Sequence, residues 1–283
     1  MKQPGLTRRE FLKIAGASLG ALAGLGSYAR WIEPHWLETV YRRLPIRGLP
    51  DALAGATLVQ LSDVHMGTQV DDNYILAAFQ RVTDLDPDIV VFTGDFITYH
   101  PGVFVQIPGV YRSFPTGRLA TLAILGNHDY GPGWSHPEIA DRVVESVTAF
   151  GVTVLRNEVR EVADLQIAGL DDLWGGRFQP EPVFAAFDPT RASLVLSHNP
   201  DTVDHAGWAD YHGWILSGHT HGGQYKPPFL PPPLLPVQNR LYTAGEFALA
   251  GNRRMYISRG VGHLLQIRFN VRPEITAFQL SAA

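Results

Sequence analysis

Five segments of the chain place metal-ligating or proton-transferring residue types directly after an apolar run. In chain order they are Asp63-Val64-His65, Gly94-Asp95, Gly126-Asn127-His128-Asp129, His198-Asn199-Pro200 and Gly218-His219-Thr220-His221. The Asp-x-His and His-x-His spacings put two side chains on one side of an extended chain, so each pair can reach one metal ion. Imidazole, carboxylate and amide ligands suit Mn, Fe or Zn better than metals that need thiolates. These residues predict a metal centre assembled from distant segments.

Taken one at a time, most of these segments also have structural explanations. A Gly-Asp pair is an ordinary turn, and Asn127-His128 can be turn chemistry as well. Two histidines crowded between glycines, as in the segment from Gly218 to Gly223, are harder to explain without a ligand. The five segments together, in this order, favour a metal site over a set of unrelated turns.

The elements that must position these residues are apolar strands separated by helices. Continuous apolar runs predict strands over residues 56–62, 89–93, 119–125, 165–170, 194–197, 215–217, 255–258 and 275–280. Apolar residues at helical spacing predict helices over 73–85, capped by Asp71 or Asp72, and over 138–150. This alternation is typical of an α/β fold with a sheet covered on both faces. Side chains at the carboxyl ends of such strands converge in one crevice.

The composition excludes several classes of protein. The chain has 283 residues and a hydrophobic fraction of 45%, which does not fit a disordered chain. It contains 11 His and no Cys, which excludes disulfide scaffolds, iron–sulfur clusters and a cysteine nucleophile. The net charge of −4 is uneven: residues 1–30 hold five basic residues against Glu10, or +4, which leaves −8 for residues 31–283. This acidic body argues against nucleic-acid binding.

Residues 1–30 have the pattern of an export signal. A basic stretch with the pair Arg8 and Arg9 precedes a short Ala-, Gly- and Leu-rich run from Ile14 to Leu25, and the pair with its neighbours resembles the twin-arginine type. The alternative is an N-terminal helix of the domain, which the many glycines disfavour. The run is shorter than the roughly 20 residues of a membrane span. Ser27-Tyr28-Ala29 is a candidate cleavage site, so the segment is either removed or kept as an anchor.

The series of motifs resembles the calcineurin-like metallophosphoesterase superfamily. The order D-x-H, G-D, G-N-H-[D/E], H and G-H-x-H is intact over residues 63–221. Flanking residues are similar to a membrane-associated bacterial branch that includes twin-arginine-exported phosphodiesterases and enzymes like UDP-2,3-diacylglucosamine pyrophosphohydrolase; they lie at 59–63, 196–201, 218–224 and 258–262. The resemblance covers the whole chain. It implies a four-layer α/β/β/α sandwich, formed by a single domain over residues 31–283, with a dinuclear metal site at the strand ends.

The resemblance also implies a role for each motif residue. Seven of them would hold two divalent ions, Mn, Fe or Zn: Asp63, His65 and His221 the first, Asn127, His198 and His219 the second, and Asp95 both. A water between the ions would attack phosphorus. His128 is the implied general acid to the leaving oxygen, and Asp129 is its implied orienting partner. Some relatives use an acidic residue three positions after Gly-Asp for this purpose. Thr98 stands there, which leaves the orienting partner open.

Other residues near the motifs are candidates for contacts to substrate or membrane. His100, Gln224, Lys226 and Arg259 are candidate substrate contacts, and the other histidines outside the motifs are expected on the surface or in loops. Residues 226–236 hold six Pro. They form either a rigid surface cover, which we favour, or an apolar lip that admits acyl chains or leans on a bilayer, made of Phe229, Leu230, Leu234 and Leu235. The apolar residues over 31–37 provide interfacial anchoring or the first strand.

The leading hypothesis is a metal-dependent hydrolase of phosphate esters, a phosphodiesterase or pyrophosphohydrolase, that is exported and membrane-associated. Its expected partners are a small phosphoester or lipid-linked phosphate, the twin-arginine export machinery and a membrane surface, but not nucleic acid. We expect a monomer in the periplasm or on the outer face of the cytoplasmic membrane. One alternative places the enzyme on the cytoplasmic face, where it acts on a nucleotide-linked lipid of the UDP-2,3-diacylglucosamine type. Another is a metal-binding module without turnover.

Overall fold

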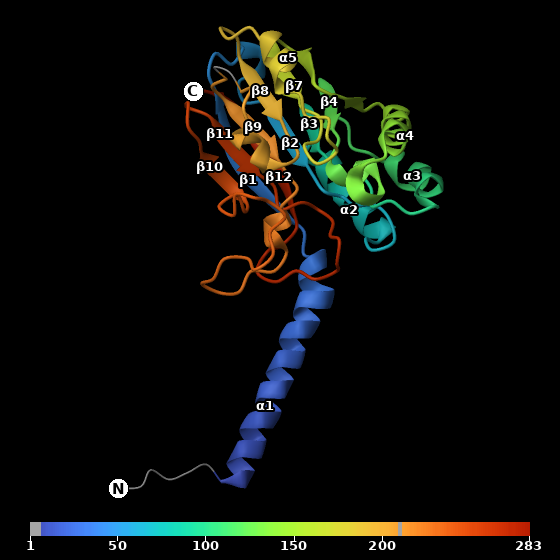
Figure 1. The fold of residues 1–283 in the computed structure, drawn as a ribbon, viewed down its shortest axis with the longest axis vertical. Coiled ribbons are helices and arrows are strands. Elements are labelled where there is room, and N and C mark those ends of the chain that lie inside the picture. The colour runs from blue at the N-terminus through green and yellow to red at the C-terminus, as the bar shows by residue number, and fades with distance from the viewer. Residues whose placement is uncertain (1–6, 209–210) are drawn as a thin grey trace.

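The computed structural model describes residues 7–208 and 211–283, whose strands form two six-stranded sheets (Figure 1). The first sheet has the order β1-β12-β2-β3-β4-β5, with bounds Glu38–Ile46, Glu274–Ala282, Thr57–Leu61, Ile89–Thr93, Ala120–Ile124 and Thr153–Val154. The second has the order β10-β11-β9-β8-β7-β6, with bounds Gly245–Ala248, Arg254–Ile257, Trp214–Ser217, Ser193–Leu196, Leu165–Gly169 and Glu158–Val162.

Three apolar layers hold the sheets and helices together. The central layer lies between the sheets and includes Leu58 and Val91 from the first sheet and Leu194 and Leu216 from the second. The outer face of the first sheet packs against α2 (Asp72–Thr83), α3 (Val103–Tyr111) and α4 (Pro137–Thr148). The outer face of the second packs against α5 (Pro180–Ala185) and the segment around Trp208. The expected four-layer α/β/β/α sandwich is confirmed.

Parallel pairing brings the ends of five strands to one rim. In the first sheet β2, β3 and β4 run parallel, with Val59 opposite Val90. In the second sheet β7, β8, β9 and β11 run parallel, with Val195 opposite Ile215. The residues that follow parallel strands gather at the carboxyl edge of each sheet. The turns after β2, β3, β4, β8 and β9 therefore face a common space at the rim.

The two helices predicted from periodicity are confirmed to within two residues. Helix α2 begins after Asp71, whose carboxylate accepts from the backbone N–H groups of Asn73 (3.0 Å) and Tyr74 (3.2 Å), so Asp71 rather than Asp72 is the cap. Helix α4 has Pro137 in its first position, where the missing N–H costs nothing. Both helices bury one apolar face against the first sheet.

The apolar pattern alone indicated one sheet, whereas the protein has two. The difference arises because the strands from β6 to β11 pair with one another and only β12 returns to the first sheet. Strand β1 was not predicted as a strand because its central residues are exposed and polar. It is an edge strand, and such strands need no continuous apolar run.

Helix α1 (Arg8–Ser27) has no buried residue and projects away from the two sheets (Figure 1). Thr7 caps it in a capping box with Glu10. The first part of the predicted signal segment, residues 1–6, lies outside the described residues. None of the described helices is both long enough and apolar enough to cross a membrane. The twin-arginine signal and the domain boundary at residue 30 stay predictions.

The segment after α1 is not the first strand of the fold. Tyr28–Ile32 forms a π-helical turn and Glu33–His35 a 3₁₀ turn, and β1 begins only at Glu38. Trp31 within this segment is 64% exposed. The alternative that residues 31–37 form a strand is therefore wrong, and interfacial anchoring stays the open interpretation of these apolar side chains.

Candidate metal centre

The five predicted motifs meet at the rim, each in the turn that follows a strand. The turns after β2, β3 and β4 come from the first sheet and those after β8 and β9 from the second, and together they carry Asp63, His65, Asp95, Asn127, His198, His219 and His221. All seven side chains are buried. Buried polar and charged groups are tolerated only when they are hydrogen-bonded, paired or bound to a metal.

Asp63, His65 and His221 form a first cluster, in which one ligand atom from each lies within 4.8 Å of the others. The Nε2 atoms of His65 and His221 are 3.0 Å apart, and Nε2 of His221 is 3.4 Å from Oδ1 of Asp63. These are the three residues that the family resemblance assigns to the first ion.

Asp95, His198 and His219 form a second cluster, again within 4.8 Å. Oδ2 of Asp95 lies 3.2 Å from Nε2 of His198 and 3.4 Å from Nε2 of His65, which belongs to the first cluster. This carboxylate therefore lies between the clusters, where the family resemblance implies the bridging ligand. Oδ1 of Asn127 lies 3.2 Å from Nε2 of His198, so the remaining predicted ligand is beside the second cluster.

Three of the predicted ligand histidines contact an oxygen atom through their other ring nitrogen. The contacts are His65 Nδ1 to the Thr98 hydroxyl at 3.1 Å, His198 Nδ1 to the Thr93 carbonyl at 2.7 Å and His219 Nε2 to the Pro236 carbonyl at 2.7 Å. Contacts of this kind fix the orientation and tautomer of a metal-binding imidazole. His65 and His198 therefore present Nε2 to the site, and His219 presents Nδ1. Thr98 supports a metal ligand rather than His128.

Five of the seven predicted ligands have left-handed backbone, with φ of 54° at Asp63, 51° at His65, 60° at Asp95, 71° at His219 and 49° at His221. This conformation costs on the order of 1–3 kcal/mol for a residue with a Cβ and is concentrated at functional sites. Gly94 has a φ of 94°, and a Cβ there would lie 2.6 Å from Nδ1 of His198. The turns are therefore built to present ligands, not to minimise local strain.

The donor set fits divalent cations. Oδ2 of Asp63 and Nδ2 of Asn127 are buried and have no hydrogen-bond partner among the described residues. An unpartnered buried carboxylate oxygen is costly, and a cation between Asp63, His65 and His221 would satisfy it. Oxygen and imidazole donors suit Mn, Fe or Zn. The seven residues could thus hold two such ions with Asp95 between them.

Burial and neighbouring charges shift the pKa values of the site residues in different directions, and at Asp63 burial raises the pKa to about 7. Burial lowers the pKa of His65, His219 and His221, for His219 to about 3, so these rings are neutral and free to coordinate. Burial opposes the charged form of Asp95, but the nearby His198, His128 and His65 outweigh it and hold the Asp95 pKa well below its ordinary value. At His198 burial favours the neutral ring, but the nearby Asp95 carboxylate outweighs this effect and raises the pKa to about 10. The centre attracts positive charge, and a bound cation would displace the His198 proton.

His128 lies beside the clusters and belongs to neither. Its ring centroid is 4.9 Å from that of His65, nearly at a right angle, and its backbone N–H donates to Oδ1 of Asp95 (2.9 Å). This hydrogen bond ties its position to the bridging carboxylate. The residue is only partly buried, so its ring can meet a substrate, as a general acid must.

Asp129 does not orient His128. Its carboxylate accepts from the backbone N–H groups of Asp95 (3.0 Å), Ile97 (3.1 Å) and Gly126 (2.9 Å), and no hydrogen bond joins it to the His128 ring among the described residues. Asp129 therefore holds the turns after β3 and β4 together and positions the backbone of metal ligands. Its predicted part in proton transfer is not supported.

Replacing Asp129 by Ala should destabilise the protein, because three buried N–H groups lose their acceptor. At about 1–3 kcal/mol for each unsatisfied group, without full additivity, we expect the free energy of unfolding to fall by about 3–5 kcal/mol. Urea denaturation measures this. The control Glu145→Ala removes an exposed carboxylate of α4 and should change stability by less than about 0.5 kcal/mol. Equal effects of the two substitutions would contradict the role of Asp129.

Two predicted substrate contacts are engaged elsewhere, and their assignment is corrected. The Arg259 guanidinium pairs with Glu274 and with Glu38 (3.0 Å), so it braces the start of β1 and β12 rather than a phosphate. The Gln224 side chain donates to two carbonyls of the 264–267 loop (3.0 Å and 3.1 Å) and accepts a backbone N–H from it. Closeness to a motif in sequence did not reveal where these side chains point.

The other two candidates differ from each other. His100 is tied within its own loop, since Nδ1 accepts from the Gly102 N–H (3.2 Å) and Nε2 contacts Oε1 of Gln106 (3.2 Å). These bonds leave it no free ring nitrogen for a substrate. Lys226 is exposed and stays a candidate. His263 lies in a loop, as expected, but is buried there.

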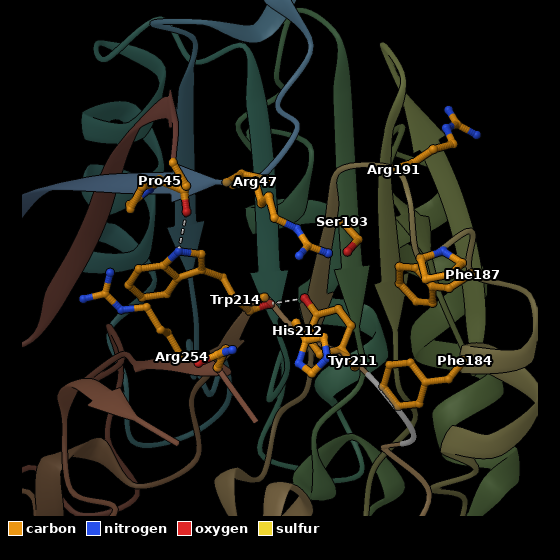
Figure 2. Close-up of a pocket in the computed structure, with 15 residues that line it drawn as sticks. Pro45, Arg47, Phe184, Phe187, Arg191, Ser193, Tyr211, His212, Trp214 and Arg254 are labelled. Carbon is orange, nitrogen blue, oxygen red and sulfur yellow. Dashed lines mark hydrogen bonds between the residues drawn. The ribbon is translucent and has the colours of Figure 1, made fainter. Parts of the chain in front are cut away.

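A cavity of about 660 Å³ lies at the opposite end of the second sheet (Figure 2). Ser193, Trp214 and Arg254, at the starts of β8, β9 and β11, line it, whereas the predicted ligands follow the ends of β8 and β9. Figure 2 shows the Arg47 side chain pointing into this cavity. None of the residues that line this cavity belongs to the two candidate metal clusters found among the described residues. We therefore place the chemistry at the rim and not in this cavity.

Comparison with known proteins decides the family. Residues 56–223 match the family model described as calcineurin-like phosphoesterase, and this span contains all seven predicted ligands. The chain belongs to this family. It is 32% identical to phosphodiesterase YaeI of Escherichia coli, over 97% of this chain and 99% of the relative. It is 35% identical to the uncharacterized metallophosphoesterase YkuE of Bacillus subtilis, over 98% of each chain.

A further relative has a more specific name. The chain is 28% identical to UDP-2,3-diacylglucosamine pyrophosphatase LpxG of Chlamydia trachomatis, over 88% of this chain and 90% of the relative. Membership of the family makes the chain a metal-dependent hydrolase of phosphoester bonds, with two His/Asp clusters suited to divalent metals.

The carbonyl groups of Thr93 and Pro236, which contact the ligand histidines, could not be predicted from the sequence, because any residue can supply a backbone carbonyl.

Proposed function

We propose that this protein is an exported phosphodiesterase or pyrophosphohydrolase that works at a membrane surface. The observation that carries the catalytic part is the complete ligand set with the partly exposed His128 beside it, because a metal-binding module without turnover needs no proton donor there. The names of two relatives, a phosphodiesterase and a UDP-2,3-diacylglucosamine pyrophosphatase, support a diester or diphosphate as the bond that is cleaved. Nitrogen and oxygen donors favour Mn, Fe or Zn as the ions.

The residues around the centre divide the work of hydrolysis. When bound, two divalent ions supply activation of a water and neutralisation of charge on the phosphoryl oxygens. The carboxylates of Asp63 and Asp95 provide the negative charge that holds cations in a buried site. His128, kept in place by its N–H bond to Asp95, protonates the leaving oxygen.

The surface around the base of α1 supports the proposal of work at a membrane. Figure 1 shows α1 leaving the body beside the loops that follow β9 and β11, and Tyr28 packs edge-on against Phe269 at 6.5 Å. The exposed apolar side chains of these segments are Trp31, Ile32, Phe229, Leu230, Leu234, Leu264, Leu265 and Ile267. Clustered exposed apolar residues are typical of a membrane or partner surface.

The Pro-rich segment over 226–236 has features of both its interpretations. The Pro236 carbonyl contacts His219 at 2.7 Å, so this end covers and supports the metal centre. Phe229 and Leu234 are 104% and 79% exposed, so the other part offers apolar side chains to its surroundings. We propose that the segment connects a membrane surface with the metal centre. Its apolar part lies against a bilayer, and its end at Pro236 lies at the site.

Export by the twin-arginine route is tested at Arg8 and Arg9. A periplasm-active reporter fused after residue 283 should be exported with the wild-type sequence and retained in the cytoplasm with Arg8→Lys and Arg9→Lys together. The paired control Arg42→Lys and Arg43→Lys changes two exposed arginines of β1 and should leave export intact. Cytoplasmic retention of the wild-type fusion would rule out export.

A second candidate is the same chemistry on the cytoplasmic face, with a lipid of the UDP-2,3-diacylglucosamine type as substrate. The name of the LpxG relative and a similarity that covers 90% of that relative favour it. Purified protein assayed against this lipid and against water-soluble diesters separates the substrate classes, and the reporter separates the compartments. Retention together with preference for the lipid would favour this candidate over the exported enzyme.

A further inference from the structure

Two tryptophans, Trp134 and Trp174, lie next to the candidate metal centre. The indole rings of Trp134 and Trp174 are stacked, with centroids 4.6 Å apart and planes at 27°. Trp174 meets the His219 ring edge-on at 4.5 Å, and Trp134 lies 6.3 Å from the His128 ring. One stack therefore touches both a predicted metal ligand and the predicted general acid. Both tryptophans are only partly buried, so the stack lies at the surface of the protein.

The turns that carry the two tryptophans are locked to each other. The hydroxyl of Tyr130 donates to Asp171, and Arg156 pairs with Asp171 at 3.0 Å and reaches the Tyr130 hydroxyl at 3.2 Å. A Cβ on Gly175 would lie 2.8 Å from the Tyr130 ring, so the loop after Trp174 packs directly on the turn before Trp134. The stack is thus held in place by bonds behind it rather than by its own contacts.

The backbone at Trp134 is also strained. Its φ is 57°, between Gly131 at 70° and Gly133 at 62° on one side and helix α4 on the other. A bulky residue in this conformation is an outlier that persists where the surroundings impose it, and such outliers gather at functional sites. The turn therefore places the Trp134 indole next to the site, although a smaller residue would serve the fold equally well.

We propose that Trp134 and Trp174 form a stacking platform for a planar aromatic group, a nucleobase, on the leaving-group side of the scissile phosphate. The inference rests on the proposed function in one respect, since His128 defines that side as the one that receives a proton. A flat pair of indoles offers a π-face, which nucleobases use for stacking. The ring contacts of the stack are with the imidazoles of His128 and His219.

The test compares two diphosphates that differ only in the base: uridine 5′-diphosphate hexyl ester and the same ester of ribose 5-diphosphate without a base. With metal-loaded full-length protein, Trp174→Leu should lower kcat/KM for the uridine substrate by about 5- to 100-fold and for the base-free one by less than threefold. Trp174→Phe should retain most of the uridine preference. The control Tyr41→Leu, at an exposed aromatic side chain of β1, should change neither.

A binding measurement separates this inference from the proposed function. Uridine 5′-monophosphate should quench tryptophan fluorescence of the full chain, with or without turnover, and Trp174→Leu should weaken its binding by a similar factor. If no diphosphate is hydrolysed but this binding is seen, the platform stands and the proposed activity fails. Equal losses on both substrates, no binding of the nucleotide, or a larger loss when the hexyl group is lengthened would each overturn the nucleobase platform.

Discussion

Asp95→Asn is expected to abolish metal binding and nearly all activity. Its carboxylate lies 3.4 Å from His65 and 3.2 Å from His198, one in each cluster, and is the only group with that position among the predicted ligands. An amide of the same size keeps the shape but removes the charge that both clusters share. Because bound divalent ions supply several kcal/mol of transition-state stabilisation, we expect kcat to fall by at least about 10³-fold.

Elemental analysis and hydrolysis of bis-p-nitrophenyl phosphate measure the two effects of Asp95→Asn separately. The control Asp141→Asn changes a carboxylate of α4 that is 66% exposed and pairs with Arg156. This variant should keep both the metal ions and the rate of hydrolysis. If Asp95→Asn binds two ions per chain and turns over at the wild-type rate, the bridging role is wrong.

His128→Ala is expected to keep the metal ions and to hydrolyse substrates more slowly. The loss of rate should be larger for leaving groups that need a proton. His128 belongs to neither cluster, and only its backbone N–H contacts Asp95, so its side chain can be removed without disturbing a ligand. General acid catalysis contributes about 10²–10⁴-fold. We expect a loss of that order for diesters with alkyl leaving groups and less than about tenfold for p-nitrophenol, which leaves without a proton.

The leaving-group dependence is what identifies the acid. His136→Ala, at a half-buried histidine paired with Glu138 at 2.9 Å in a neighbouring turn, serves as the control and should leave both rates unchanged. Metal loss in His128→Ala would overturn the assignment, because the residue would then be a ligand. The same fractional loss on alkyl and nitrophenyl esters would show that the ring positions the substrate without transferring a proton.

The ligands could be predicted from sequence because each follows a strand directly. Asp63, Asp95 and His198 each stand within two residues of the end of a mostly apolar strand, so they are found in the sequence where apolar runs stop. The parallel order of strands then brings them together, since turns at the carboxyl edge share one space. The second sheet could not be predicted in this way, because apolar runs do not tell which strands pair.

The supporting groups and substrate contacts were harder for a different reason. Gln224 and Arg259 lie close to motifs in sequence, yet their side chains turn to the 264–267 loop and to Glu274. The position of Asp129 next to His128 in the sequence predicts that the two side chains interact, but the 3₁₀ turn over Asn127–Tyr130 sends adjacent side chains in different directions. Trp134 and Trp174 are 40 residues apart, and only the folded chain shows that they stack.

Metal dependence of hydrolysis by the purified full chain is the most direct test of a dinuclear catalytic centre at the rim. Protein stripped with a chelator is titrated with Mn, Fe, Co or Zn, and the hydrolysis of bis-p-nitrophenyl phosphate is followed. We predict negligible activity without metal and a rise to a plateau near two ions per chain with at least one of these metals. Undiminished hydrolysis by stripped protein, or none with any of the four metals, would contradict the account.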